Sequence, residues 1–67
     1  PSPSTGSVTL ENLVINQVLH IYTAFGDLIF KLIPRERQAR IDVSELPSGI
    51  YYLQQGGERR GKLIVLR

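Results

Sequence analysis

Short apolar runs rich in Val, Ile, Leu, Thr and Tyr recur along this chain, and Gly, Pro, Asn or Asp separates them at intervals of roughly ten residues. Several runs alternate, as where Leu19 and Ile21 flank His20, and alternation places one face of a strand in a core and the other in water. Strands are expected near residues 7–10, 18–23, 28–33, 39–43, 49–55 and 62–66, with a less regular seventh at 13–15. The pattern predicts an all-β fold, an antiparallel β-sandwich of six to seven short strands.

Turn residues lie between the expected strands. Phe25-Gly26-Asp27 has the residue types of a tight hairpin turn, because glycine adopts positive φ without steric cost, so strands 18–23 and 28–33 should pair antiparallel. Residues 46–49 form a second turn, with Pro47 fixing φ at its first corner, and residues 54–61 are expected to form a third. Helix is the weaker alternative for residues 8–17, where β-branched side chains disfavour it.

The length of 67 residues allows one domain, and a hydrophobic content of 42% is ordinary for a globular fold. Residues 1–6 are linker-like, since they lack apolar side chains and include two prolines, and residues 7–67 are expected to form the domain. The chain begins without methionine and reads as a module of a longer protein. No apolar run approaches the roughly 20 residues of a membrane helix, so no membrane insertion is expected.

Residues that could support catalysis are few. His20 is the only histidine and cysteine is absent, so no zinc site of three or four ligands can be assembled from these types. The carboxylates are scattered over expected turns and solvated faces, and no serine lies in a Gly-x-Ser-x-Gly elbow. The sequence therefore predicts no catalytic residue, no metal site, no cofactor and no enzyme activity.

Two features of the sequence suggest a binding function. Arginines cluster at residues 35–40 and 59–60, but the net charge is only +2 and no aromatic RNA-binding motif accompanies them, so nucleic acid is not expected as a partner. Tyr22, Tyr51 and Tyr52 could form a sugar-stacking surface, and an accessory carbohydrate-binding or structural module is the alternative function. Because Tyr51 and Tyr52 are adjacent in a strand, at least one should contact the core.

The expected last strand is apolar on both faces, and only its ends, Lys62 and Arg67, are charged. Strands at a free sheet edge are normally protected by charge, proline or a bulge. An unprotected strand of this kind can pair with a receptor, or with a second copy in a homodimer through edge strands.

Several motifs in chain order resemble the type IX sorting domain of Bacteroidetes. They are Pro1-Ser2-Pro3, Gly6 before Val8-Thr9-Leu10, the hairpin from Ile21-Tyr22 to Gly26, the block from Ile41 through Leu46-Pro47-Ser48-Gly49-Ile50-Tyr51, and the closing Lys62-Leu63-Ile64-Val65. Two positions depart from the family pattern, with Thr23 where aspartate is usual and Ser2 where asparagine is common.

The resemblance implies an immunoglobulin-like β-sandwich that acts as a C-terminal secretion signal for a cargo protein upstream. Its partners would be the type IX translocon and a cell-surface sortase, which cleaves the domain and attaches the cargo to anionic lipopolysaccharide. Localisation would be the periplasm in transit, then the cell surface or the medium. Some members are secretion-machinery components that retain the domain, which stays an alternative.

Carried over by position, Pro47, Gly49 and Tyr51 match the family's Pro-x-Gly-x-Tyr element. Gly57, Lys62, Leu63 and Val65 match its final hairpin and strand. With Ile64, Leu66 and Arg67 of the same strand, these residues are the expected recognition signal. Each also has a purely structural interpretation in shaping a turn or completing a sheet.

Overall fold

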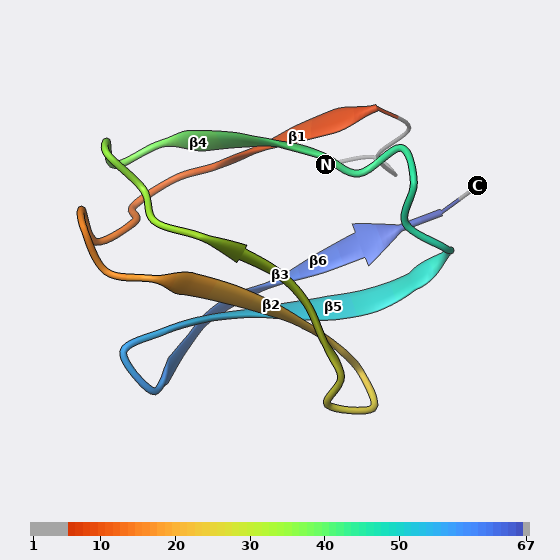
Figure 1. Ribbon diagram of the computed structural model, residues 1–67. Helices are drawn as coiled ribbons and strands as arrows, with labels where there is room; N and C mark the ends of the chain where they lie inside the picture. Colours follow the sequence, from red (N-terminus) through yellow and green to blue (C-terminus); the bar gives the residue numbers. More distant parts are fainter. Residues whose placement is uncertain (1–5, 67) are drawn as a thin grey trace.

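The structure is a computed structural model that describes residues 6–66, so Pro1-Ser2-Pro3 and Arg67 lie outside the described residues. Within residues 6–66, six strands form two antiparallel sheets and confirm the all-β prediction. The strands are β1 (Ser7–Leu10), β2 (Leu19–Thr23), β3 (Leu28–Leu32), β4 (Ala39–Asp42), β5 (Gly49–Gln55) and β6 (Glu58–Val65). β1 pairs with β4, and the larger sheet has the order β3-β2-β5-β6 (Figure 1).

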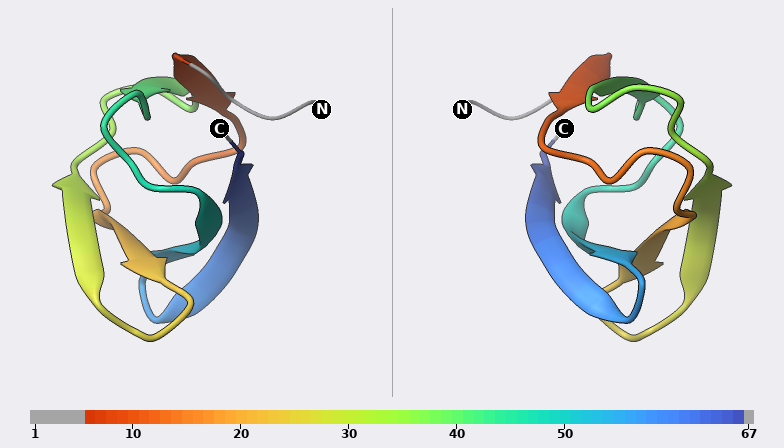
Figure 2. Two further views of the ribbon diagram at one scale, coloured as in Figure 1. Left: turned by 90° about the vertical axis from the view of Figure 1, so that its right-hand side faces the viewer. Right: turned by 90° about the vertical axis from the view of Figure 1, so that its left-hand side faces the viewer.

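The two sheets form the layers of a sandwich around one apolar core. The larger sheet curves below the β1–β4 pair, which Figure 2 shows from both ends. Alternate residues of its strands face inward and are joined by residues of β4 and the adjoining loops. The buried cluster consists of Leu13, Leu19, Ile21, Ile41, Val43, Tyr51, Leu53, Leu63 and Val65. The period-two pattern of the sequence thus decides which side chains are removed from water.

The β2–β3 hairpin forms where Phe25-Gly26-Asp27 predicted it. Gly26 has a φ of 93°, a conformation that glycine adopts without strain. The Thr23 hydroxyl oxygen accepts hydrogen bonds from the backbone N–H groups of Phe25 and Asp27, each at 3.2 Å. Threonine therefore supplies a hydrogen-bond acceptor at the position where aspartate is usual, and the departure leaves the hairpin intact.

The structure corrects the predictions at the C-terminal hairpin. The turn expected over residues 54–61 is wrong, because β5 continues to Gln55 and β6 already begins at Glu58. Gly56 and Gly57 alone reverse the chain, and a bulge between Leu53 and Gln54 absorbs the register shift. The polar residues that suggested a loop belong instead to an exposed edge strand.

Other boundaries change by one residue. The prediction for 18–23 begins one residue early, and those for 28–33, 39–43 and 62–66 end one residue late. Residues 13–15 form no strand, because the positive φ of Asn12 and Asn16 (60° and 67°) interrupts the extended backbone on both sides. No helix in the described part of the chain is long and apolar enough to cross a membrane.

Candidate recognition surface

The C-terminal strand β6 forms one edge of the larger sheet, as Figure 1 shows. Its alternate side chains separate sharply by burial. Leu63 and Val65 are 7% and 0% exposed and belong to the core, whereas Ile64 and Leu66 are 46% and 51% exposed. The strand is thus apolar on both faces, as predicted, but only one face is available to a partner.

Pro47, Gly49 and Tyr51 form an internal brace at the start of β5. The Tyr51 ring is buried, and its hydroxyl donates a hydrogen bond to the Pro47 carbonyl oxygen at 2.5 Å. Gly49 opens β5 opposite Val65 and lies beside the Tyr51 ring. The turn itself lies at residues 43–46, where the Leu46 N–H donates to the Val43 carbonyl oxygen at 3.1 Å, and not at the predicted 46–49. Tyr51 links the segment after this turn, through Pro47, to β6, where it is opposite Leu63.

Gly57 and its neighbour Gly56 form the two-residue loop between β5 and β6. Their φ values are 82° and 58°, and a type I′ turn requires positive φ at both central residues. Gly56 was not among the predicted site residues, yet it is the more constrained. A Cβ atom there would lie 2.3 Å from the Gln17 side-chain nitrogen, whereas one at Gly57 would meet nothing within 4 Å.

Gln55 is a second residue that the sequence analysis missed. It is 2% exposed, and its amide oxygen accepts a hydrogen bond from the Val14 N–H at 3.0 Å. Its amide nitrogen donates to the carbonyl oxygens of Val14 and Gln17 at 3.0 and 2.7 Å. This fully bonded side chain fastens the loop between β1 and β2 to the last hairpin. The sequence could have indicated its burial, because Gln55 lies two residues after Leu53 and therefore on the same, inward side of the strand.

The opposite side of the larger sheet, here called the outer face, faces away from β1 and β4 (Figure 2). The strand register places ten residues on it: Lys31, His20, Gln54 and Arg59 in one row, Leu28, Tyr22, Tyr52 and Lys62 in the next, and Ile50 with Ile64. Tyr22 and Tyr52 thus lie side by side on the central strands, Ile50 and Ile64 form an apolar pair at one end of the face, and the cationic side chains lie on the two edge strands. The alternation in the sequence predicted only that this side of the strands faces water, and that prediction is incomplete.

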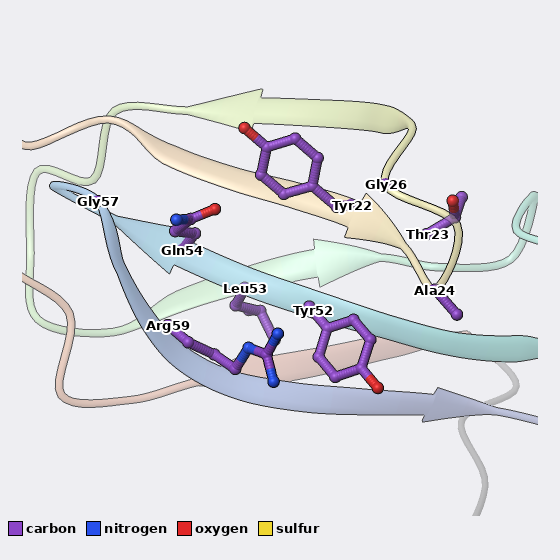
Figure 3. Close-up of a pocket in the computed structure, with 9 residues that line it drawn as sticks. All are labelled: Tyr22, Thr23, Ala24, Gly26, Tyr52, Leu53, Gln54, Gly57 and Arg59. Atoms are coloured by element: carbon purple, nitrogen blue, oxygen red, sulfur yellow. The ribbon is translucent and has the colours of Figure 1, made fainter.

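A shallow hollow of about 470 Å³ lies on this face (Figure 3). Tyr22 and Tyr52 are directly opposite each other in register, and the Arg59 guanidinium carbon lies 4.4 Å from the centre of the Tyr52 ring. The His20 and Tyr22 ring centres are 6.0 Å apart. Since Tyr51 is buried, only two of the three tyrosines named for a sugar-stacking surface share an exposed face, which corrects that set.

The predicted signal residues therefore occupy different positions in the fold. Tyr51, Leu63 and Val65 are interior residues, Pro47 and Gly49 belong to the brace beside them, and Gly57 lies in the loop. Lys62, Ile64 and Leu66 are exposed. Residues 6–66 contain no group of three or more His, Cys, Asp or Glu side chains placed to hold a metal ion.

Comparison with known proteins gives one family. Residues 1–65 match the secretion system C-terminal sorting domain, whereas no curated protein and no solved structure matches the chain. Domains of this family act as sorting signals of the type IX pathway in Bacteroidetes, a non-catalytic role that implies export to the cell surface or secretion. Because the match covers nearly the whole chain, the protein belongs to the family of type IX secretion C-terminal sorting domains.

Proposed function

We propose that this domain carries a cargo from the periplasm across the outer membrane because the type IX translocon recognises its C-terminal strand. A cell-surface sortase then cleaves the domain and attaches the cargo to anionic lipopolysaccharide. The observation that supports the proposal is the edge position of β6 together with the exposure of Ile64 and Leu66. An edge strand offers unpaired backbone N–H and C=O groups to an incoming strand.

In recognition by strand addition, alternate residues of β6 have different roles. Backbone groups of β6 pair with the receptor, and the side chains of Ile64 and Leu66 enter its pockets. Leu63 and Val65 cannot enter those pockets without unfolding the core, because they are already buried. Their part in the signal is to hold β6 in place, as is that of Pro47, Gly49, Tyr51 and Gly57. Lys62 and Arg67 complete the proposed signal.

The test is export of a fluorescent reporter fused to residues 1–67 behind a signal peptide, in a type IX-competent bacterium and in a translocon-deficient strain. Delivery to the surface or medium in the first strain only is the expected result. A second fusion lacks residues 66 and 67, which removes the exposed Leu66 but keeps the buried Val65, and it should be folded but retained in the periplasm. Normal export of that truncation would show that the last strand is not the signal.

The same experiment separates the alternative roles. A domain retained by a secretion-machinery component would leave the reporter exported or membrane-associated with the domain still attached, which immunoblotting detects. A carbohydrate-binding or spacer module would leave the wild-type fusion folded in the periplasm.

Self-association is a further consequence of the free edges. β3 is the other edge of the larger sheet, and its Leu28, Ile29 and Phe30 are exposed. We expect the isolated domain to form homodimers through edge strands at high concentration. Light scattering of wild type and an Ile29→Lys variant checks this, because a charge on β3 should shift the wild-type dimer towards monomer if β3 pairs.

A further inference from the structure

The outer face combines apolar, aromatic and cationic side chains without a carboxylate. None of the ten strand residues that the register places on it is Asp or Glu, although the chain has six acidic residues. Lys31 borders it on β3, and Arg59 and Lys62 border it on β6. A sheet face with this distribution presents one sign of charge on its edge strands, beside exposed aromatic and aliphatic side chains.

Two of the residue types on this face are those that dominate protein interfaces. Tyrosine and arginine are enriched among the residues that supply most binding energy, and here the Arg59 guanidinium lies over the Tyr52 ring (Figure 3). Ile50 and Ile64 are both exposed and are opposite each other in register. Exposed aliphatic side chains beside tyrosine favour a protein partner with apolar side chains of its own over a saccharide.

The outer face is continuous with the strand to which the proposed function assigns recognition. Ile64 lies on both, and Lys62 lies opposite Tyr52 on the neighbouring strand β5. A receptor strand added to the edge of β6 would therefore bring the rest of its surface against this face.

We propose that the outer face is a second contact for the type IX receptor, and that it binds a protein surface that combines apolar side chains with acidic ones. The inference rests on the proposed function and specifies its partner. Opposite charges on the edge strands steer the encounter and fix the orientation, and the neighbouring Tyr52, Ile50 and Ile64 supply the apolar contact.

The experiment compares two double charge reversals in the reporter fusion. Lys31→Glu with Arg59→Glu alters the outer face without changing a residue of the proposed signal, and Arg35→Glu with Arg37→Glu alters the connection between β3 and β4. Each pair lowers the net charge by four, from +2 to −2. All four side chains are exposed, so both variants should fold, which thermal unfolding of the purified fusions checks.

Export of the outer-face variant should fall by about tenfold or more, because attraction becomes repulsion, while the control variant should be exported like wild type. The neutral pair Lys31→Gln with Arg59→Gln should give an intermediate loss. Equal export of wild type and the outer-face variant would overturn the inference and leave the proposed function standing. Equal losses in both charge-reversed variants would also overturn it, since net charge alone would then explain them.

Two further outcomes are distinguishable. Retention of the wild-type fusion would refute the proposed function and this inference with it. Binding of the purified wild-type fusion to immobilised alginate, lost in the outer-face variant while export is unchanged, would assign the face to an acidic glycan and overturn the protein partner.

Discussion

The two faces of the sheet β3-β2-β5-β6 are built from the same strands yet have opposite roles. On β6, Leu63 and Val65 turn inward and are removed from water, while Lys62 and Ile64, which alternate with them, turn outward. The inner face holds the domain together, and the outer face and edge are what another protein can contact. Under the proposed function, stability and recognition depend on alternate residues of one strand, so neighbouring substitutions should fail for different reasons.

The largest expected contrast is between Leu63→Ala and Ile64→Ala. Leu63→Ala should cost about 2–5 kcal/mol of unfolding free energy, because it removes a buried side chain and leaves a cavity. In a domain of this size that is a large share of the total stability. Chemical denaturation monitored by circular dichroism measures both variants.

Ile64→Ala is the matched control, since Ile64 is nearly half exposed. Its unfolding free energy should stay within about 0.5 kcal/mol of wild type, as for most surface substitutions, while its export falls. A loss of stability at Ile64 as large as at Leu63 would erase the distinction between the two faces.

The next contrast is between the adjacent glutamines of β5. Gln55→Glu should destabilise by about 2–3 kcal/mol, because the carboxylate replaces two donated hydrogen bonds with repulsion towards the carbonyl oxygens of Val14 and Gln17. Gln54→Glu makes the same chemical change on the outer face, and no comparable loss is expected. Thermal unfolding at neutral pH compares them, and equal shifts would contradict the anchoring role of Gln55.

A smaller effect is expected at the glycines of the last hairpin. Gly56→Ala should cost about 1–2 kcal/mol, because alanine is strained at positive φ and its Cβ displaces the Gln17 side chain. Gly61→Ala is the control, since a Cβ there meets nothing within 4 Å and its φ is not in the left-handed region. Denaturant midpoints measure both, and an unchanged Gly56→Ala midpoint would show that the loop adapts freely.

The smallest contrast separates two tyrosines. Tyr51→Phe should cost about 1 kcal/mol through loss of the hydrogen bond to Pro47, whereas Tyr52→Phe should change stability little. Differential scanning calorimetry can resolve such a difference in a small domain. Reversal of the order would indicate that the Tyr52 hydroxyl, and not that of Tyr51, braces the sandwich.

The predicted strands were placed well where alternation and turn chemistry agree, as at Ser7–Leu10 and Gly49–Gln55. Prediction failed at Glu58–Gly61, because polar residues in an exposed edge strand have the composition of a loop. It also failed at residues 13–15, where Leu13 enters the core from an irregular segment. The Leu13 N–H donates to the Arg37 carbonyl oxygen, a contact between residues distant in sequence that no local pattern encodes.

Only some residues of the candidate recognition surface follow from the sequence. The motif residues around Tyr51 and the last strand were identified by their resemblance to a family, but the resemblance does not distinguish interior residues from exposed ones. Gln55 and Gly56 were missed because their importance comes from contacts with Val14 and Gln17, nearly forty residues earlier in the chain. The outer face was missed because its members come from four strands, and only the register makes them neighbours.

By itself the sequence determined the all-β class, the β2–β3 hairpin and the family, because alternation, turn residues and motifs are local properties of the chain. Tertiary structure decided which strands are edges, which residues of β6 are buried, and which side chains share the outer face. Those outcomes depend on sheet order and register, which are set when strands distant in sequence bury their apolar faces together.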